Sequence, residues 1–329
     1  MNRLLFGGSL ALLANPLAAQ EAEAVSAPSP NQIVAEAAAE EWVAIAPDDL
    51  LVMTLAPDAQ GNARQAVIQL MPAPFSQGWV ENIRTLARAG WYDGVSINRV
   101  QDNYVVQWGD PNVDNPEADG DAKALPEGLQ VMDEEDYVET CSVGEEGSIV
   151  LWHPRDYYVD SYGDFAQIDN GWPTASEISD DTRVLQRWPV HCYGMVGVGR
   201  SYSPDTGTGA ELYTVIGHAP RHLDRNIALV GRVIEGIEHL SSLPRGKGDL
   251  GFYVDPAKRV PIKSIVLGSE LREPPRFEYL STEGETFARY AEARANRRDP
   301  FFIAPAGGAD ICNIPVPVRR VASDETPPN

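Results

Sequence analysis

The sequence predicts a mostly β fold, a closed antiparallel β-barrel of about eight strands capped by two α-helices. Three observations carry this prediction. Segments patterned as strands and helices follow the order strand, strand, helix, several strands, helix, strand. Hydrophobic residues make up 43% of the 329 residues, enough to build a sizeable core. The chain also holds 28 Gly and 26 Pro, which supply turns between short strands.

The first unit of the predicted barrel is a β-hairpin. Residues 50–55 and 64–71 are strand-like runs, and residues 57–62 between them (PDAQGN) have the composition of a turn. Ahead of the hairpin we expect a flexible linker over 20–32, which is rich in Ala, Glu, Pro and Ser, and a short helix over 33–42.

An amphipathic helix follows the hairpin. Ser76 stands where an N-cap is needed, and Gly90 stands where a helix would end. Between them, apolar residues recur at a spacing of three or four while charged residues face away. The apolar set is Val80, Ile83, Leu86 and Ala87, and the charged set is Glu81, Arg84 and Arg88.

The rest of the barrel comes from short strands and a second helix. The strands are expected at 95–100, 104–108, 191–198, 211–217, 227–231 and 260–267. The second helix is expected from 233 to about 242. The barrel domain then spans 33–271, and 272–329 form a C-terminal extension. There Thr282 and Glu285 have capping-box spacing, ahead of a helix that carries Phe287, Tyr290 and Ala291.

Most of the negative charge lies in one segment of the chain. Between Asp110 and Thr182 there are 20 acidic residues and two bases, Lys123 and Arg155. We interpret about 111–189 as an irregular acidic insert on one face of the barrel, and call it the acidic insert. Its aromatic residues indicate that it folds back onto the domain.

The overall charge excludes two classes of partner. The formal net charge is −22, from 48 Asp plus Glu against 26 Lys plus Arg. No basic surface is available to displace counterions from phosphates, which argues against a nucleic-acid partner. The same balance argues against binding to an anionic membrane surface.

The N-terminus has the order of a secretory signal peptide. A basic start at Arg3 precedes the apolar run Leu4–Leu13, and small residues end at Ala19, after which we expect cleavage. The apolar run is shorter than the roughly 20 residues that a membrane span needs. We therefore expect residues 1–19 to be removed, leaving a soluble, monomeric protein without membrane insertion, exported to a bacterial periplasm.

The three cysteines, Cys141, Cys192 and Cys312, allow one disulfide in an oxidising compartment. Three pairings are possible, and spacing does not choose among them. We favour Cys192–Cys312, because it would tie the C-terminal extension to the barrel.

Local catalytic and metal motifs fail on inspection. Residues 205–207 (DTG) occur once and follow no apolar strand, whereas an aspartic-protease site needs two such carboxylates. His218 and His222 have a metal-ligand spacing on a helix, but Pro220 lies between them. We expect no metal and no cofactor.

A distributed pattern is more informative than any of these motifs. Residues 75–94 read FSQGWVENIRTLARAGWYDG, and residues 97–110 read INRVQDNYVVQWGD. Residues 193–196 read YGMV, 209–213 read GAELY, and HLD at 222–224 precedes VGRVIEG at 230–236. In this order and spacing the pieces resemble the cyclophilin family of peptidyl-prolyl cis–trans isomerases. The resemblance implies a cyclophilin-like barrel that binds proline-containing polypeptides and needs no metal or cofactor.

The resemblance also assigns roles to single residues. Arg99 would donate to the proline nitrogen of a twisted amide, and Gln107 would hold the substrate carbonyl. Tyr104, Val105, Tyr213 and Leu223 would line an apolar slot for the proline ring. The remaining substrate-binding candidates are Val196, Gly197, Glu211 and His222. Without the resemblance, we would interpret Arg99 as a surface ion-pair partner and Gln107 as a hydrogen-bond partner of a neighbouring loop. The slot residues would be interpreted as part of the barrel core.

The sequence departs from the family pattern at several of these positions. Gly197 replaces an Asn, Glu211 a Gln, and Trp108 a Gly; Asn98, His222 and Ile227 also differ. The carboxylate of Glu211 would pair with Arg99 or repel it. Two functions follow: an isomerase for exported proteins, or a cyclophilin-like binding or chaperone module with weakened turnover.

Overall fold

The structure is a computed structural model that describes residues 27–113, 118, 120–142, 160–178 and 184–321. The expected signal peptide and most of the expected linker lie outside these residues. No helix within the described ranges is both long and apolar enough to span a membrane.

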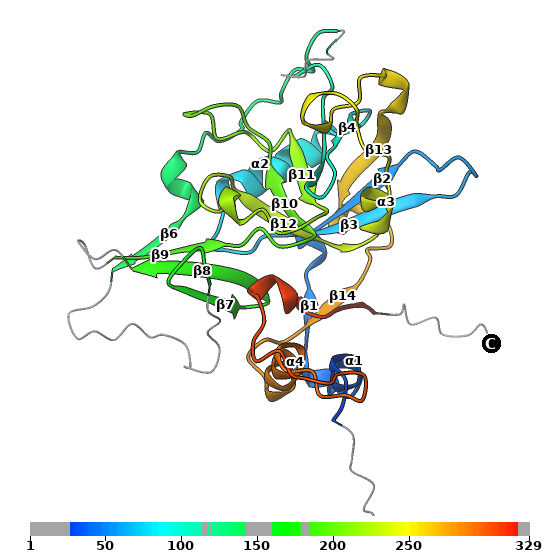
Figure 1. Ribbon diagram of the computed structural model, residues 1–329. Coiled ribbons are helices and arrows are strands. Elements are labelled where there is room, and N and C mark those ends of the chain that lie inside the picture. Colours follow the sequence, from blue (N-terminus) through cyan, green and yellow to red (C-terminus); the bar gives the residue numbers. More distant parts are fainter. Residues whose placement is uncertain (1–26, 114–117, 119, 143–159, 179–183, 322–329) are drawn as a thin grey trace, which may run out of the picture.

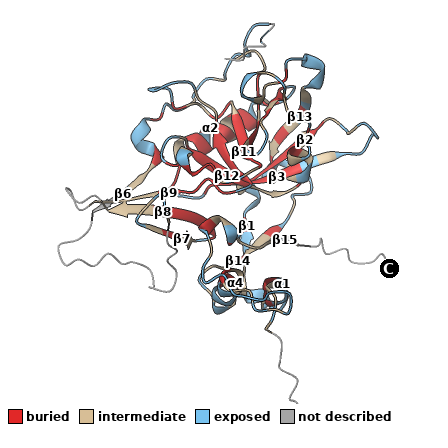
Figure 2. Ribbon diagram, in the orientation of Figure 1, coloured by how far each residue is buried: buried red, intermediate tan, exposed pale blue. Residues whose placement is uncertain are grey.

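Eight strands close into an antiparallel barrel in the order β10-β11-β5-β4-β13-β2-β3-β12 (Figure 1). The strands are β2 (Leu50–Leu55), β3 (Arg64–Leu70), β4 (Ser96–Val100), β5 (Val105–Gly109), β10 (Met195–Val198), β11 (Leu212–Val215), β12 (Leu229–Glu235) and β13 (Val260–Leu267). The predicted barrel and all eight of its strands are confirmed, including the hairpin that pairs Leu50 with Gln69. Figure 2 shows that the buried residues concentrate in these strands and in the helix packed against them.

Two helices belong to the barrel. Helix α2 (Gln77–Arg88) buries Val80, Ile83 and Leu86 completely, as its spacing predicts. Ser76 occupies the N-cap position in a left-handed conformation, but its side chain makes no cap hydrogen bond. Gly90 follows the helix with φ +61°, a conformation that favours glycine.

The second helix is much shorter than expected. Helix α3 covers only Glu238–Ser241, because Val233 and Glu235 continue strand β12 and pair with β3. The alternation of a strand and the spacing of a helix overlap in this short apolar run, so the pattern alone did not separate them.

The acidic insert is only partly irregular, contrary to expectation. Its described residues from Glu139 onward include a four-stranded antiparallel sheet in the order β6-β9-β8-β7. These strands are β6 (Glu139–Ser142), β7 (Phe165–Asp169), β8 (Trp172–Ile178) and β9 (Val184–Pro189). Trp172 and Trp188 are fully buried, so part of the insert packs on the core, as its aromatic residues indicate.

Both ends of the described chain form one further layer (Figure 1). Strand β1 (Trp42–Ile45) pairs with β14 (Phe277–Leu280), which pairs with β15 (Val318–Arg320). Helices α1 (Pro30–Ala35) and α4 (Glu285–Ala295) share a small core that includes Ile33, Phe287 and Tyr290. The N-terminal residues up to 45 therefore pack with the extension, and Ile45 also contacts the barrel through Leu50 and Val67.

Two helix boundaries in this layer differ from the sequence expectation. Helix α1 begins at Pro30, inside the expected linker, because Ser29 and Gln32 form a capping box. Helix α4 begins at Glu285 with Gly284 as its N-cap. Thr282 instead accepts a hydrogen bond from the backbone N–H of Gly171 in the acidic insert.

The extension and the insert are tied to the barrel at specific points. The disulfide Cys192–Cys312 joins the segment before β10 to the extension, as favoured from the sequence. The buried Arg232 of β12 donates to Gln69 Oε1 at 2.9 Å and to the carbonyl oxygen of Gly171 at 2.6 Å. Its guanidinium also lies 4.4 Å from the Trp172 ring centroid, and burial lowers the pKa of Arg232 to about 10.

The disulfide should contribute strongly to stability, because it closes a loop between residues 120 positions apart. We expect the double variant Cys192→Ala, Cys312→Ala to lose about 2–5 kcal/mol of unfolding free energy. Chemical denaturation measures this loss, and the reduced wild type should show a similar one. Unchanged denaturation midpoints in both samples would contradict the prediction.

Candidate active site

A cavity of about 680 Å³ opens beside strands β4, β5 and β11. Three further parts of the chain complete its wall: the loop 199–208, Leu250 with Phe252, and Val113, Lys123 and Leu125 at the start of the acidic insert. Seven of the predicted site residues line it: Arg99, Tyr104, Val105, Gln107, Glu211, Tyr213 and Leu223. The barrel therefore brings together residues that lie more than 120 positions apart in the sequence.

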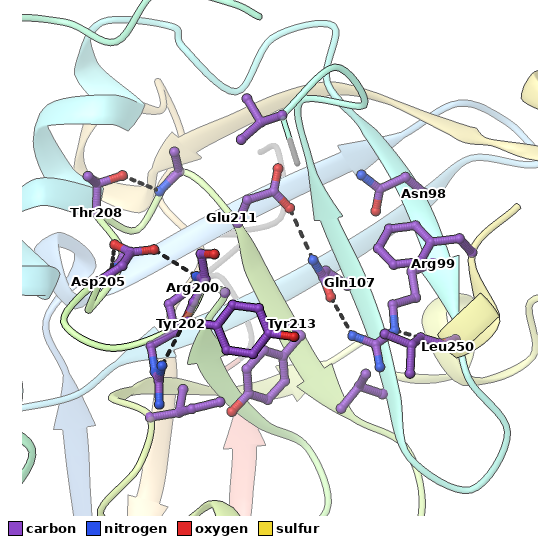
Figure 3. A pocket seen from close by; sticks show the side chains of 18 of the residues that line it. Asn98, Arg99, Gln107, Arg200, Tyr202, Asp205, Thr208, Glu211, Tyr213 and Leu250 are labelled. Atoms are coloured by element: carbon purple, nitrogen blue, oxygen red, sulfur yellow. Dashed lines mark hydrogen bonds between the residues drawn. The ribbon is translucent and has the colours of Figure 1, made fainter. Parts of the chain in front are cut away.

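A row of polar side chains crosses this cavity (Figure 3). Arg99 pairs with Gln107 across β4 and β5, and Gln107 pairs with Tyr213 across β5 and β11. Arg99 Nη1 donates to Gln107 Oε1 at 2.9 Å. Gln107 Nε2 in turn donates to Glu211 Oε2 at 3.3 Å. The register of three strands thus fixes the orientation of the Gln107 amide, with its oxygen facing Arg99.

Glu211 therefore neither pairs with Arg99 nor displaces it, because Gln107 stands between them. The carboxylate also depends on Gly109 for its space. A Cβ atom at Gly109 would lie 2.0 Å from Glu211 Oε1.

Arg99 is held by neutral oxygen acceptors. Its Nε donates to the carbonyl oxygen of Leu250 at 2.7 Å, and its Nη2 donates to Gln101 Oε1. The guanidinium carbon lies 5.8 Å from the ring centroid of Tyr104 and 5.6 Å from that of Phe252. Burial lowers the pKa of Arg99, but arginine remains charged at neutral pH.

The hydrogen-bonding capacity of Arg99 is not exhausted by these contacts. A guanidinium has five N–H donors. Within the described part of the chain three of them are used, so one N–H on each Nη atom is left for a ligand in the cavity.

Beside Arg99 lies an apolar slot formed by Tyr104, Val105, Tyr213 and Leu223. These side chains and Ile227 form a hydrophobic cluster of their own, separate from the barrel interior. Val105 of β5 and Tyr213 of β11 project outward, because side chains alternate between the two faces of a strand. Tyr104 precedes β5, and Leu223 lies in the short 3-10 turn Arg221–Leu223. The cavity therefore combines an apolar wall with one charged donor.

A buried network supports the back of this slot. The Tyr213 hydroxyl lies 2.9 Å from His191 Nε2, and His191 Nδ1 lies 2.8 Å from Asp224 Oδ1. Asp224 Oδ2 accepts from Arg221 Nε at 2.6 Å, and Arg221 also forms two hydrogen bonds with Asp160 of the acidic insert. Burial lowers the pKa of His191 and raises that of Tyr213, so both are neutral at pH 7.

Three predicted substrate-binding residues do not line the cavity. Val196 is fully buried in the main core, so we no longer assign it a substrate contact. Gly197 lies behind Tyr213, where a Cβ atom would be 2.3 Å from the Tyr213 hydroxyl. His222 is exposed at the outer edge and stacks on Tyr104, with 6.2 Å between ring centroids.

Sequence reasoning missed several wall residues. Leu250 and Phe252 contact Arg99, yet they lie about 150 residues away in a loop without periodicity. Val113, Lys123 and Leu125 of the acidic insert also line the cavity. The charge of the insert marked it as a surface segment, and no pattern indicated which of its residues reach the site. Among the described residues, no group of three or more His, Cys, Asp or Glu is placed to hold a metal ion.

Comparison with known proteins now decides the family. The sequence profile of cyclophilin-type peptidyl-prolyl cis–trans isomerases matches residues 73–267, more than half of the chain. The chain belongs to the cyclophilin family. This is a family of enzymes, and the matched range contains every barrel strand except the hairpin β2–β3.

Solved cyclophilin structures are also similar to this chain. Cyclophilin AquaCyp293 from Hirschia baltica has 22% sequence identity and a TM-score of 0.59, covering 90% of this chain and 98% of that one. This likeness shows the shared fold. A Cryptosporidium parvum cyclophilin, crystallised in the presence of the dipeptide Ala-Pro, has 14% identity and a TM-score of 0.36, with coverages of 66% and 98%. No curated protein matches the chain.

The buried histidine of this cyclophilin makes stability depend on pH. Burial lowers the pKa of His191 below the ordinary histidine value near 6.5. As the pH falls, this histidine is therefore protonated in the unfolded chain before it is protonated in the folded protein. The stability that neutral His191 contributes to the fold is complete above pH 6.5 and is lost as the pH falls below it.

We expect the unfolding free energy to fall between about pH 7 and about pH 5, and to fall more steeply in the wild type than in His191→Gln. Urea denaturation at both pH values measures these slopes. His218→Gln, which changes an exposed histidine, should keep the wild-type slope. Equal slopes in wild type and His191→Gln would contradict the prediction.

Proposed function

We propose that this protein accelerates cis–trans isomerisation of X-Pro bonds, with Arg99 as its catalytic residue. One observation carries the proposal: a charged guanidinium, two of whose N–H groups have no partner among the described residues, stands beside an apolar slot. The slot suits a proline ring, and the guanidinium beside it would reach the imide nitrogen of that proline with a hydrogen bond.

The chemistry needs no covalent intermediate. The barrier to rotation is about 18–20 kcal/mol, because resonance gives the C–N bond partial double-bond character. Rotation breaks this resonance and returns a lone pair to the nitrogen. A hydrogen bond from Arg99 to that lone pair strengthens only in the twisted state, so it lowers the barrier without tightening the ground state.

Gln107 is the second residue of the proposed site. Its Oε1 accepts from Arg99, and one N–H of its Nε2 donates to Glu211. The other N–H of Nε2 would hold the carbonyl oxygen of the residue before proline. Glu211 thus acts on the substrate through Gln107, as a positioning residue.

We propose exported polypeptides as substrates. The N-terminal residues have the order of a secretory signal peptide, and the Cys192–Cys312 disulfide suits an oxidising compartment such as a periplasm. There, uncatalysed X-Pro isomerisation takes tens of seconds or longer and delays folding. Val113 and Leu125 would place the acidic insert against residues that flank the proline.

A second function, peptide binding with little turnover, is favoured by one contact. Glu211 already accepts one N–H of Gln107, so Gln107 has one donor fewer with which to bind a substrate carbonyl. Both functions predict that the protein binds X-Pro peptides, and only the isomerase predicts acceleration.

Two-dimensional exchange NMR on an X-Pro peptide separates them. We expect catalytic amounts of the wild type to produce exchange between the cis and trans resonances, and Arg99→Ala to reduce the rate by at least about tenfold, as for the loss of one transition-state donor. A wild type that binds the peptide without accelerating exchange would contradict the isomerase and support the peptide-binding function. Equal rates for both proteins would remove Arg99 from the mechanism.

A further inference from the structure

The buried network behind the slot joins the candidate active site to the acidic insert. We propose that Asp160, Arg221, Asp224 and His191 are positioning residues for Tyr213, so that docking of the acidic insert sets the affinity of the slot for proline. This inference rests on the proposed function and adds a specificity device to the same site.

The slot end of the network is built around the tyrosine hydroxyl. Tyr213 O–H donates to His191 Nε2, which is free to accept because His191 Nδ1–H donates to Asp224. Gly197 leaves the space for this hydroxyl, since a Cβ atom there would lie 2.3 Å from it. Gly197 and Tyr213 therefore form a matched pair. The hydrogen bond fixes the ring that forms the slot wall.

The middle of the network holds a buried carboxylate with several donors. Asp224 Oδ1 accepts from the backbone N–H and the ring of His191, and its Oδ2 accepts from Arg221 Nε. The side chains of His191, Asp224 and Arg221 are at most 3% exposed. A buried charge is tolerated only when it is paired and hydrogen-bonded, so these groups hold one another in one arrangement.

The far end of the network lies in the acidic insert. Arg221 Nη1 donates to Asp160 Oδ1 at 3.0 Å and Nη2 donates to Asp160 Oδ2, a two-point contact with a side chain that is 3% exposed. The guanidinium carbon of Arg221 also lies 4.8 Å from the Tyr162 ring centroid. Removing Asp160 would leave the cation of Arg221 in a buried site with less compensation, so its contact with Asp224 would have to adjust.

The network does not include the proposed catalytic donor. Arg99 is held by Leu250, Gln101 and Gln107 on the other wall of the cavity. A change at Asp160 should therefore reach the substrate through the slot wall, which binds proline, and not through the group that acts on the nitrogen. Its effect should appear in KM rather than in kcat.

Steady-state kinetics on an X-Pro peptide test this split. We expect Asp160→Asn to raise KM by about fivefold, a usual size for coupled neighbours, with kcat within twofold of wild type. Asp160→Glu, which keeps the carboxylate, should restore part of the loss. Glu177→Gln is the matched control. Glu177 of the insert forms an ion pair with Arg225, which follows Asp224 in the chain, but this pair is exposed and lies outside the buried network. Glu177→Gln should leave both constants unchanged.

A double-mutant cycle shows whether the effect passes through the tyrosine hydroxyl. Tyr213→Phe keeps the ring but loses the bond to His191, so it should raise KM by itself, and Asp160→Asn should then add little in the Tyr213→Phe background. Additive effects, or a fall in kcat alone, would overturn the proposal. If Asp160→Asn does not fold, Tyr213→Phe alone decides, since an unchanged KM would also overturn it.

The failure of this inference is distinguishable from that of the proposed function. A wild type without isomerase activity contradicts the proposed function. The double-mutant cycle of Asp160→Asn and Tyr213→Phe is then repeated with the dissociation constant of the peptide as the measured quantity. An active wild type in which Tyr213→Phe and Asp160→Asn leave KM unchanged contradicts only the inference.

Discussion

The cation of Arg99, held beside an apolar slot by neutral acceptors, is the interaction on which the rest of the site depends. A half-buried charge needs hydrogen bonds, which the Leu250 carbonyl, Gln101 and Gln107 supply. None of these acceptors neutralises the guanidinium, so its charge remains available to a substrate. Glu211 is one residue further along the row and acts on Arg99 only by orienting Gln107. A carboxylate bonded directly to Arg99 would consume the donors that the proposed chemistry requires.

The barrel supplies this arrangement through strand register. Arg99, Gln107 and Tyr213 are neighbours on β4, β5 and β11, and their side chains share the outer face of the sheet. The inner face of the same strands is filled by the main core, which keeps the three backbones at fixed separations. The added segments act on this frame from outside: Arg232 and the disulfide join the barrel to the insert and the extension, and Arg221 joins the insert to the slot.

Much of this could be predicted from the sequence, where a strong local pattern coincided with the family pattern. The hairpin, helix α2 and the positions of Arg99, Gln107 and Tyr213 follow from apolar periodicity and motif order. The sheet in the acidic insert could not be predicted, because its strands alternate weakly and the charge of the whole segment suggested a solvated loop. Val196 was misplaced because a motif fixes a position along the strand but not which face its side chain takes. The contacts of Leu250 with Arg99, and of Asp160 with Arg221, are long-range pairings that no local pattern encodes.

The central claim is that Arg99 acts on the twisted amide and contributes little to ground-state binding. Line-shape analysis of an X-Pro peptide titrated with wild type and Arg99→Lys measures both the dissociation constant and the interconversion rate of the bound peptide. Lysine keeps the charge but loses the planar fork that fixes Arg99 to three acceptors. The account predicts a dissociation constant within about twofold of wild type and a bound-state rate at least about tenfold slower. Weakened binding with an unchanged bound-state rate would contradict it.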